Sequence, residues 1–454
     1  MRLTVIPVLA PWRRTSLGAK QIRSMVIISH PTGNANAREA AKALNDAELL
    51  SEFWTSVSWR GEYLLNAVLP SSLRRELGRR SFPQARPSQV RIHPALEVAR
   101  LLAIRFGLSG LVKHEVGRFS VDAVYRSLDR RVAARLKRKP KVSAVYAYED
   151  GAVESFRAAQ DLGIKTIYEL PIGYWKAYRE LMEQEAALQP EWAMTLPGNS
   201  DSAEKRNRKD EELARASRIL VPSQYVSKTL RAAGSLNAQI TVVPYGAPTV
   251  GIPVERSSLS PERKLKVIFI GSLSQRKGVS YLLEAIGRLA SAVELTLIGR
   301  RVGECRPLDS ALRVHRWIPS LSHSEVLQEL EHHDVMVFPS LFEGFGLVVL
   351  EAMACGVPVI ATPNGAAPDI IHDGQDGFIV PIRDSQALAE RLERLRKDRT
   401  LLASMSAAAR HTASQHSWQR YRERLTEIVL RTLMDDVDEQ SGISSPSQLQ
   451  ACRS

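Results

Sequence analysis

Short apolar runs alternate with amphipathic segments along most of the chain. In the first half, the runs that are typical of strands lie at 25–29, 143–148, 165–169, 218–222 and 240–244. A turn-forming stretch after the first run leads into a helical pattern, AREAAKALNDA, at 37–47. Runs of this length between helical segments are typical of parallel strands covered by helices. Residues 50–125, with clustered cations and Trp54 and Trp59, show a blurred pattern that predicts no definite elements.

The same alternation resumes in the second half. Residues 251–264, GIPVERSSLSPERK, are polar and rich in Pro and Ser, which indicates a linker. The apolar runs that follow it lie at 265–270, 294–299, 334–339 and 357–361. Two successive series of this kind predict an α/β protein made of two Rossmann-like domains.

These boundaries divide the chain into six parts. We predict an extension at 1–24, a first Rossmann-like domain at 25–245, a linker at 246–264, a second Rossmann-like domain at 265–415, a C-terminal helix at 416–434 and a disordered tail at 435–454. Pro7 and Pro11 interrupt the first apolar stretch, which favours an extension over a signal peptide. Met25 directly precedes the first strand, so either Met1 or Met25 could be the functional start.

The composition excludes several classes of protein. The 454 residues are 44% hydrophobic and 24% charged, as in ordinary globular proteins. No run approaches the roughly 18 to 20 apolar residues of a membrane-spanning helix. Cys305, Cys355 and Cys452 lie far apart without CxxC spacing. This argues against a disulfide framework or structural zinc and favours a reducing cytoplasm.

The net charge of +13 is unevenly distributed. Residues 1–150 hold 26 basic and 12 acidic side chains, whereas the rest of the chain is close to neutral. The densest basic segments are 73–80, LRRELGRR, and 126–141, RSLDRRVAARLKRKPK. In the second, an apolar stripe of Leu128, Val132 and Leu136 predicts a helix that packs on the sheet with a solvated face. The alternative is peripheral docking of these cations on an anionic membrane surface.

The first cluster of chemically suitable residues follows the strand at 265–270. The strand ends at Gly271, and the loop SLSQRKG presents Arg276 and Lys277 before the next helix. Open α/β sheets bind ligands where the carboxyl end of a strand opens into a helix. Two adjacent cations there suit a diphosphate, because Arg offers a bidentate fork and Lys a point charge. Two solvated cations in a loop are the alternative.

The second cluster lies in FPSLFEGFGLVVLEAMACGVPVIA, residues 338–361. A glycine-containing loop with Glu343 leads into a helix that is predicted to begin near Leu347 and to stop at Gly356. The glycines allow backbone N–H groups to approach a ligand, and the helix N-terminus favours phosphate. Glu343 and Glu351 can face one crevice and accept hydrogen bonds from sugar hydroxyls. Alternatively, Glu351 is an ordinary solvent-facing residue.

Together these motifs resemble the GT-B glycosyltransferases, and are most similar to family 4 of the retaining, nucleotide-sugar-dependent enzymes. The resemblance is carried by GSLSQRKG at 271–278 and by Glu343 and Glu351 in their segment. Supporting residues are 364–365, DGQDGFIVP at 373–381, and VPSQYVSKTL and VVPYG within 221–246. The resemblance covers most of 215–400 closely and the first half only in plan. It implies two Rossmann-like domains whose parallel sheets face each other across a cleft.

The resemblance also implies individual roles. Arg276 and Lys277 would contact the donor diphosphate, and Glu351 would bind the ribose hydroxyls. Glu343 would hold donor-sugar hydroxyls close to the reacting carbon. Further donor contacts would be the strand end at Gly271, the base neighbours Trp317 and Ile318, and the loop and helix start at Gly344, Phe345, Gly346 and Leu347. Trp317, in a predicted loop at 315–319, could equally be packed.

On the acceptor side, similar enzymes use a glycine-containing loop after the first strand. His30, Gly33 and Asn34 occupy that place, although His30 could equally cap a turn or be packed. Many relatives carry a histidine after a middle strand, where this sequence has Glu149 and Asp150. Either carboxylate could act as a base or contact the acceptor, and either could instead be a helix N-cap.

We therefore expect a cytoplasmic hexosyltransferase, peripheral on the inner face of the membrane. It would move a sugar from a UDP- or GDP-sugar to a hydroxyl of a glycan or lipid-linked acceptor in polysaccharide or glycolipid biosynthesis. The resemblance implies retention of the anomeric configuration. No metal or other cofactor is expected, because Arg276, Lys277 and the helix N-terminus can neutralise the leaving diphosphate. The DxD-like spacing at 436–438 lies in the predicted tail.

Three other functions fit the sequence less well. A GT-B nucleotide-sugar epimerase would use the same donor site without an acceptor. A dinucleotide oxidoreductase is disfavoured, because no G-x-G-x-x-G follows a strand with an acidic residue about 20 positions later. A nucleic-acid-binding protein is the remote alternative, since the basic segments lack interleaved aromatic residues or a recognisable binding module.

Overall fold

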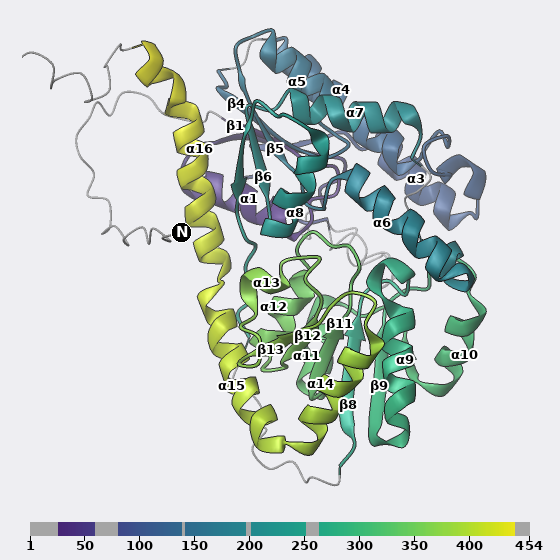
Figure 1. The fold of residues 1–454 in the computed structure, drawn as a ribbon. Coiled ribbons are helices and arrows are strands. Elements are labelled where there is room, and N and C mark those ends of the chain that lie inside the picture. The colour runs from purple at the N-terminus through teal and green to yellow at the C-terminus, as the bar shows by residue number, and fades with distance from the viewer. Residues whose placement is uncertain (1–25, 60–79, 139–140, 197–200, 251–262, 441–454) are drawn as a thin grey trace, which may run out of the picture.

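The computed structural model describes residues 26–59, 80–138, 141–196, 201–250 and 263–440, which form two α/β domains, one above the other in Figure 1. The first domain has a seven-stranded parallel sheet in the order β3-β2-β1-β4-β5-β6-β7. Its strands are β1 (Val26–Ser29), β2 (Leu50–Thr55), β3 (Val90–Ile92), β4 (Ala144–Tyr148), β5 (Lys165–Glu169), β6 (Arg218–Val221) and β7 (Gln239–Val242).

The second domain has a six-stranded parallel sheet in the order β10-β9-β8-β11-β12-β13. Its strands are β8 (Leu265–Ile270), β9 (Val293–Ile298), β10 (Arg316–Ile318), β11 (Val335–Phe338), β12 (Val359–Ala361) and β13 (Gly377–Ile379). In both sheets the strand order changes direction beside the first strand of the domain, which is where open α/β sheets bind ligands.

Helices cover both sheets. In the first domain they are α1 (Ala35–Asp46), α3 (Ala95–Arg105), α4 (Val121–Leu136), α5 (Val153–Gln160), α6 (Trp175–Leu188), α7 (Ala203–Ala214) and α8 (Gln224–Thr229). In the second they are α9 (Val279–Leu289), α10 (Arg306–Val314), α11 (His323–Glu331), α12 (Leu347–Ala354), α13 (Ala367–Ile370), α14 (Ser385–Lys397) and α15 (Arg399–Gln415). The final helix is α16 (Trp418–Gln440).

The nine predicted strands are confirmed, with ends that differ by at most two residues. Residues 50–125, for which no elements were predicted, contain β2, β3, α3 and the start of α4. The polar Glu52 interrupts the apolar pattern of β2. It is nevertheless buried, because it accepts hydrogen bonds from Trp54 Nε1 (2.8 Å) and from Arg135 Nη2 of α4 (2.9 Å).

The basic helix predicted at 126–141 is α4, which begins earlier, at Val121. Ser120 caps it by accepting a hydrogen bond from the N–H of Ala123 (3.1 Å). The stripe Leu128, Val132 and Leu136 is buried, so the helix packs on the sheet as predicted. The basic segment at 73–79 and the extension at 1–24 lie outside the described residues.

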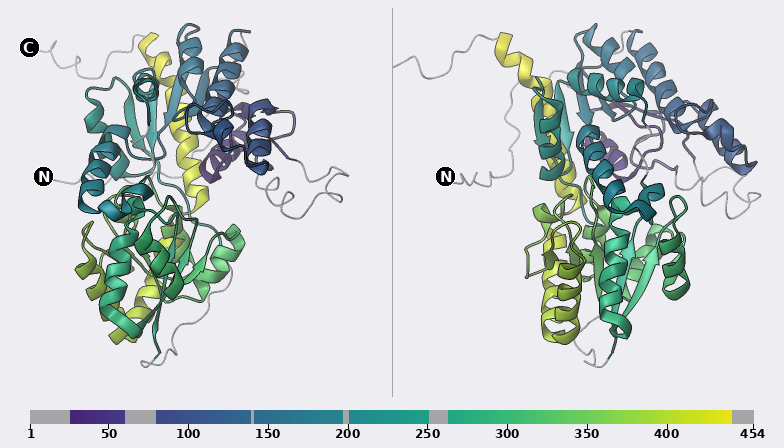
Figure 2. Two further views of the ribbon diagram at one scale, coloured as in Figure 1. Left: turned by 90° about the vertical axis from the view of Figure 1, so that its right-hand side faces the viewer. Right: turned by 45° about the vertical axis from the view of Figure 1, so that its right-hand side comes forward.

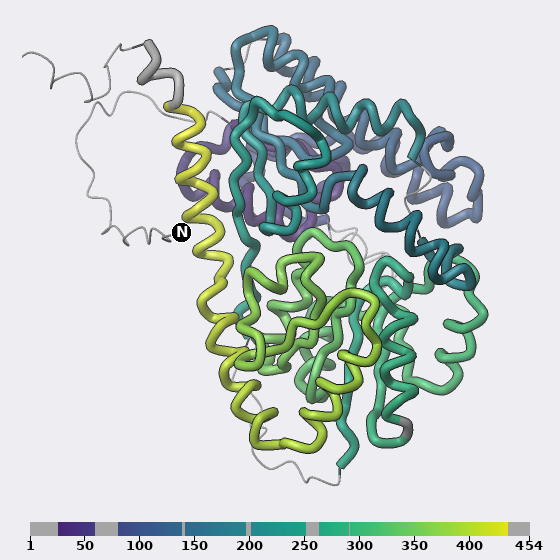
Figure 3. The backbone as a smooth tube through the Cα atoms, viewed as in Figure 1, coloured from purple at the N-terminus to yellow at the C-terminus, as the bar shows by residue number. Residues whose placement is uncertain are grey.

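Two predicted boundaries were wrong. Residues 316–318, predicted as part of a loop, form the edge strand β10, which pairs with β9. The C-terminal helix does not stop at 434 but continues to Gln440, so the 436–438 segment is helical. Figure 3 shows this helix returning along the first domain, where Arg422 Nη1 reaches Glu39 Oε2 of α1 (2.6 Å). Residues 441–454 lie outside the described residues.

Helix α6 crosses from the first domain to the second (Figure 1). Near its end, Glu185 is fully buried and accepts hydrogen bonds from three residues of the second domain: Gln275 Nε2 (2.7 Å), Tyr281 Oη (2.8 Å) and Arg383 Nε (2.6 Å). A buried carboxylate is tolerated only with such partners, so this contact fixes α6 against the second domain. Within the described residues, no helix is both long and apolar enough to cross a bilayer.

Candidate active site

The loop after β8 brings two cations to the carboxyl edge of the second sheet. The chain leaves β8 at Gly271 and makes a short 3-10 turn, η5 (Gln275–Lys277), before α9. Gly278 closes the turn with φ +68°, and a side chain there would strike the carbonyl oxygen of Pro339. Lys277 is 8% exposed, and Arg276 is half-buried beside it.

Glu343 faces both cations from the loop before α12. Its N–H donates to the carbonyl of Asn364 (3.0 Å), which fixes the loop. Its carboxylate forms an ion pair with Lys277 Nζ, and Arg276 Nη1 lies 3.4 Å from Glu343 Oε2. Arg276 also donates to the carbonyl of Phe342 (2.9 Å). Three of the predicted donor residues therefore meet in one cluster.

Burial and charge oppose each other in this cluster. Burial alone would raise the pKa of Glu343, but the charges of Lys277 and Arg276 outweigh it and hold that pKa below its usual value. Burial lowers the pKa of Lys277, and the charge of Arg276 acts in the same direction. With all three groups ionised, the cluster carries one net positive charge, which favours an incoming anion.

Helix α12 begins beside this cluster, at Leu347 as predicted. Its N-cap is Gly346 in the left-handed conformation (φ +80°), so no side chain occupies the helix N-terminus. The first N–H groups of an α-helix have no partners within the helix and carry partial positive charge. Phe345, just before the N-cap, is buried against Tyr245 with ring centroids 5.0 Å apart. The predicted stop is also confirmed, since Gly356 follows the helix with φ +70°.

Glu351 lies in the second turn of α12. Its side chain is 16% exposed, so it is not a solvent-facing residue. The carboxylate lies 3.1 Å from Nε2 of His323, at the start of α11, and this hydrogen bond raises the pKa of His323. No local sequence pattern indicates this partner, because α11 comes from a separate part of the chain.

Trp317 and Ile318 lie on β10, at the edge of the second sheet. The indole Nε1 of Trp317 donates to the carbonyl of Gly299 (3.0 Å), so the ring is held against the end of β9. Gly299 in turn packs on Gly271, since a Cβ on Gly299 would lie 1.8 Å from the Gly271 carbonyl oxygen. These contacts bring the ends of β8, β9 and β10 together. That Trp317 and Ile318 lie beside the base of the donor stays a prediction.

The first domain touches this site through the loop after β5. A Cβ on Gly344 would lie 1.8 Å from the carbonyl oxygen of Pro171, and one on Gly173 would strike the ring of Phe342. Ser223 Oγ, at the start of α8, donates to the carbonyl of Gly344 (2.7 Å). The glycines at 173 and 344 therefore allow the two domains to meet in backbone contact beside the cation cluster.

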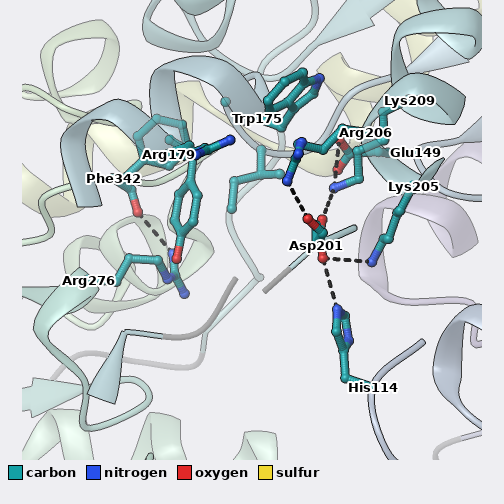
Figure 4. Close-up of a pocket in the computed structure, with 13 residues that line it drawn as sticks. His114, Glu149, Trp175, Arg179, Asp201, Lys205, Arg206, Lys209, Arg276 and Phe342 are labelled. Atoms are coloured by element: carbon teal, nitrogen blue, oxygen red, sulfur yellow. Dashed lines mark hydrogen bonds and ion pairs between the residues drawn. The ribbon is translucent and has the colours of Figure 1, made fainter. Parts of the chain in front are cut away.

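A cavity of about 540 Å³ opens between the domains at this point (Figure 4). Its lining combines an aromatic and aliphatic wall with cations from both domains. The residues are His114, Glu149, Ile172, Gly173, Trp175, Tyr178, Arg179, Asp201, Lys205, Arg206, Lys209, Arg276 and Phe342. Arg276 thus belongs to the cation cluster and also lines this cavity.

The cations on the first-domain side come mainly from α7. Lys205 and Lys209, one helical turn apart, both reach Asp201, at 3.3 Å and 3.2 Å. Lys209 Nζ also lies 3.5 Å from Glu149. Burial would lower the pKa of Lys209, but the surrounding carboxylates, Glu149 first among them, raise it. Lys209 therefore stays charged.

One group among the described residues has oxygen and nitrogen atoms close enough to hold a metal ion: His114, Glu115 and Asp201. His114 Nε2 lies 2.9 Å from Asp201 and 3.2 Å from Glu115. The same carboxylate of Asp201 is occupied by Lys205 and Lys209. Two ammonium groups at this distance would repel a cation, so the residues fit an ion-pair network and not a metal site.

Glu149 and Asp150 follow β4, and Glu149 lines the cavity. Burial raises the pKa of Glu149, partly offset by Lys209. Asp150 adopts φ +71° and lies 3.5 Å from Lys205. Neither residue caps α5, because the N-cap of this helix is Ala152. The backbone N–H groups of Asp150 and Ala152 donate to the carboxylate of Glu212 on α7 (both 2.9 Å). The N-cap alternative was therefore wrong.

His30 is buried and caps the turn after β1. Its Nδ1 accepts hydrogen bonds from the N–H groups of Thr32 (3.2 Å) and Gly33 (2.8 Å). Burial lowers the pKa of His30 to about 4, so the ring is neutral at physiological pH. Its ring packs edge-on against Tyr148, with centroids 4.7 Å apart.

Gly33 and Asn34 shape the start of α1. A Cβ on Gly33, at φ +57°, would overlap the ring of Phe82, and Asn34 caps α1 by accepting from the N–H of Ala37 (3.4 Å). Both residues therefore stabilise the start of α1.

Four of the residues predicted for the acceptor side or for catalysis line a second, smaller cavity of about 240 Å³. It is lined by His30, Asn34, Glu149 and Asp150, together with His114, Val121, Asp122, Tyr125, Tyr148, Pro171 and Lys205.

The sequence reasoning missed most of the larger cavity. The missed residues are His114, Ile172, Gly173, Trp175, Tyr178, Arg179, Asp201, Lys205, Arg206, Lys209 and Phe342. Only α7 carried a usable signal, since KRNRKD at 205–210 places two lysines four positions apart on one helix face. The others lie on segments whose relation to the donor loop depends on how the domains meet.

Comparison with known proteins supports the resemblance for the second half of the chain. Residues 253–412 match the family model described as Glycosyl transferases group 1. The chain is 30% identical over 196 residues to the putative colanic acid biosynthesis glycosyltransferase WcaL of Salmonella typhimurium, covering 39% of this chain and 48% of that protein. It is 33% identical over 181 residues to the D-inositol 3-phosphate glycosyltransferase of Arthrobacter sp., covering 37% and 43%.

The chain thus spans less than half the length of these two curated relatives. Within the matched region, the resemblance to group 1 glycosyltransferases is confirmed. Assignment to family 4 stays a prediction.

Solved structures resemble the chain over almost its whole length. Sucrose-phosphate synthase from Thermosynechococcus elongatus superposes with a TM-score of 0.65 at 17% identity, covering 91% of this chain and 100% of that one. HepE from Anabaena, in complex with UDP-glucose, superposes with a TM-score of 0.57 at 16% identity, covering 89% and 99%. At such identities the likeness concerns the fold alone. The predicted fold, GT-B with two Rossmann-like domains, is confirmed.

Proposed function

We propose that this protein is a glycosyltransferase that moves a sugar from a nucleotide-diphosphate sugar to an acceptor hydroxyl in the cleft between its two domains. The observation that carries the proposal is the cluster of Arg276, Lys277 and Glu343 at the carboxyl edge of the second sheet. It lies beside the N-terminus of α12 and next to a cavity that residues of both domains line. Diphosphate and sugar hydroxyls are the groups that such a cluster would bind best.

In this proposal the leaving diphosphate is bound by Arg276, Lys277 and the N-terminus of α12. Lys277 already has an anionic partner in Glu343, so the donor phosphates would share a preformed cation. Charge that develops on a leaving phosphate is stabilised most by donors that are already in place. We propose that no metal is needed, and chelation by EDTA should leave the transfer rate unchanged.

The two carboxylates would divide the recognition of the donor. Glu343, whose pKa is held low, stays an acceptor for the hydroxyls of the transferred sugar down to acidic pH. Glu351, held by His323, would accept from the ribose hydroxyls. The backbone of Gly344, Phe345, Gly346 and Leu347 would complete the donor site.

The donor is proposed to be a UDP- or GDP-sugar. UDP is supported by two neighbours in fold. HepE from Anabaena is described in complex with UDP-glucose, and TarM of S. aureus in complex with UDP. Retention of the anomeric configuration is part of the proposal and rests on the resemblance to retaining enzymes.

The acceptor is proposed to enter the 540 Å³ cavity from the first-domain side. Glu149 lines that cavity, and burial raises its pKa, which makes its carboxylate a stronger base toward the proton of a hydroxyl. Trp175 and Tyr178 offer flat apolar surfaces of the kind that pack against sugar rings. We propose a glycan or lipid-linked acceptor in polysaccharide or glycolipid biosynthesis, carried out in the cytoplasm at the inner face of the membrane.

Donor binding tests this proposal directly. Lys277→Ala and Glu351→Ala should each weaken the binding of UDP- or GDP-glucose about tenfold or more, because each removes a charged hydrogen-bond partner. Isothermal titration calorimetry measures the change, with thermal unfolding as the check that each variant is folded. Lys397→Ala, which removes an exposed lysine on α14, is the matched control and should bind as the wild type does.

Unchanged affinity in both site variants would overturn the donor-site assignment. Product analysis with and without an acceptor then distinguishes transfer from epimerisation. A transferase forms the glycosylated product only when the acceptor is present, whereas an epimerase converts the donor without one.

A further inference from the structure

Exposed apolar side chains gather on one part of the first domain. Nine of the fourteen large hydrophobic residues that are exposed in the described part of the chain lie within 92–121. They are Ile92, Val98, Leu102, Ile104, Phe106, Leu108, Leu111, Val116 and Val121. We name this set the α3 face. Three of its residues lie on α3 and one on the 3-10 turn η2 (Ser109–Val112) that follows, and the other five lie on neighbouring parts of 92–121.

Part of the α3 face forms a row along the helix. Val98, Leu102 and Phe106 are spaced four residues apart, which aligns them on one side, and Phe106 is 71% exposed. Figure 2 shows α3 projecting from the body of the first domain. Soluble proteins rarely leave apolar surface of this extent without a partner, so the face indicates a docking surface.

The opposite side of α3 is fixed firmly to the domain. Glu97 is 1% exposed and bonds Arg80 Nη1 (2.6 Å) and Arg100 Nε (2.6 Å). Burial would raise the pKa of Glu97, but its hydrogen bonds to Arg100 and Arg80 hold the pKa below its usual value. The exposed face is therefore presented by an anchored helix.

Charge on this surface has one sign. Arg91, Arg105, Lys113 and Arg118 are exposed around the apolar residues. The two carboxylates of 91–121 point elsewhere. Glu97 is buried, and Glu115 accepts the N–H of Ser202 (3.0 Å) at the edge of the cleft. An apolar surface surrounded by cations matches the interface of an anionic bilayer, where apolar side chains enter the lipid and cations meet the headgroups.

We propose that the α3 face docks the protein on an anionic membrane surface. The helix is too short to cross a bilayer, so the docking is interfacial. The surface differs from the two basic segments that the sequence indicated, since 73–79 lies outside the described residues and α4 packs its apolar stripe on the sheet.

The α3 face adjoins the cleft. His114, two residues after η2, lines both cavities and reaches Asp201 (2.9 Å) in Figure 4. A membrane that contacts Leu111 and Val116 would therefore lie at the entrance of the cleft. This step rests on the proposed transfer of a sugar: the acceptor hydroxyl would be carried by a lipid and reach the cavity without leaving the membrane.

Vesicle flotation of the full chain tests the docking. Wild-type protein should float with vesicles of equal parts phosphatidylcholine and phosphatidylglycerol, and far less with phosphatidylcholine alone. The double variant Phe106→Asp/Leu108→Asp should lose about tenfold or more in partitioning, because two apolar groups are replaced by charges that repel the headgroups. Val314→Asp is the matched control, since Val314 is 78% exposed on the second domain, and it should float as the wild type does.

A second variant separates the electrostatic part. Arg105→Glu/Arg118→Glu should weaken flotation at least about fivefold per cation at low salt, and the difference should shrink at about 1 M salt. Circular dichroism shows whether each variant is folded.

The proposal is overturned if wild-type protein does not float with anionic vesicles, or if the Phe106 and Leu108 variant floats equally well. It is also overturned if light scattering shows a dimer that this variant dissociates, because a second copy would then cover the face. Donor binding measured without vesicles distinguishes the two proposals. The affinity for the donor should be unchanged in the α3-face variants. If the wild-type protein did not bind the donor, this would count against the proposed glycosyltransferase function and not against membrane docking.

Discussion

At the scale of single residues, the site depends on ionisable groups whose environment decides their charge. Glu343 is buried beside Lys277 and Arg276, and the charges of these two residues outweigh burial and hold the pKa of Glu343 below its usual value. His30 shows the opposite case, since a histidine without an anionic partner is held neutral by burial. Desolvation opposes charge in both places, but only Glu343 has neighbouring cations that outweigh it.

His30 should make the stability of the protein depend on pH. Its pKa is about 4 in the folded state and about 6.5 when unfolded, so the unfolded chain binds the proton first as pH falls. The stabilisation is complete above pH 6.5 and is lost between pH 6.5 and 4, by roughly 3 kcal/mol. His30→Asn keeps an acceptor for the turn and should flatten this part of the curve of unfolding free energy against pH.

Urea unfolding at several pH values measures the effect. His411→Asn, at an exposed position on α15, is the control and should keep the wild-type pH dependence. If the His30 and His411 variants gave the same slope between pH 4 and 6.5, the explanation would be wrong.

At the scale of elements, helix starts beside the cleft are stabilised by side chains from other helices. The N–H groups of Glu154 and Ser155 in α5 donate to the buried Asp129 of α4 (2.7 and 3.0 Å). Glu212 of α7 accepts from the residues just before them. The sequence suggested that Glu149 or Asp150 caps α5. Instead, carboxylates from α4 and α7 accept the hydrogen bonds of the backbone N–H groups at the start of this helix. They fix Glu149 and Asp150 at the mouth of the cavity.

Asp129→Ala should therefore destabilise the protein by about 2–3 kcal/mol, because it leaves two buried N–H donors without a partner. Asp129→Asn keeps one acceptor oxygen and should cost less. Ser322→Ala removes the cap of α11 at the surface and should cost about 1 kcal/mol, which makes it the comparison. Chemical denaturation measures all three, and an equal effect for Asp129→Ala and Ser322→Ala would contradict the assigned role.

At the scale of the whole molecule, the cleft depends on how closely the domains approach. Two contacts define the approach: the loop Pro171–Gly173 against Gly344, and Glu185 of α6 against Gln275 and Arg383. The first is a backbone contact that only glycine permits. Close approach excludes water, which would otherwise compete with the acceptor hydroxyl.

Gly344→Ala should open the cleft, because the added methyl group would lie 1.8 Å from the backbone carbonyl of Pro171. We expect a loss of about 1–3 kcal/mol in stability and a slower sugar transfer. Small-angle X-ray scattering should show a larger radius of gyration. Gly287→Ala, in an open position on α9, is the control and should stabilise by up to about 1 kcal/mol without changing the transfer. Equal scattering curves for both variants would count against this contact.

Much of the fold could be predicted from the sequence. Apolar runs such as those of β4 and β8 are buried on both faces, so their pattern is clear without tertiary information. The exceptions were segments whose burial depends on distant partners. Glu52 is hidden in β2 only because Arg135 pairs with it, and Trp317 extends the sheet only because β9 is beside it.

The sequence by itself determined where the cation cluster lies. Arg276 and Lys277 lie in one loop, and Glu343 and Gly346 in another, and parallel strands bring both loops to the same edge of one sheet. The tertiary structure decided most of the lining of the 540 Å³ cavity. Trp175 of the first domain and Phe342 of the second line one cavity through the packing of the two domains, and no local pattern encodes contacts between residues so far apart in the chain.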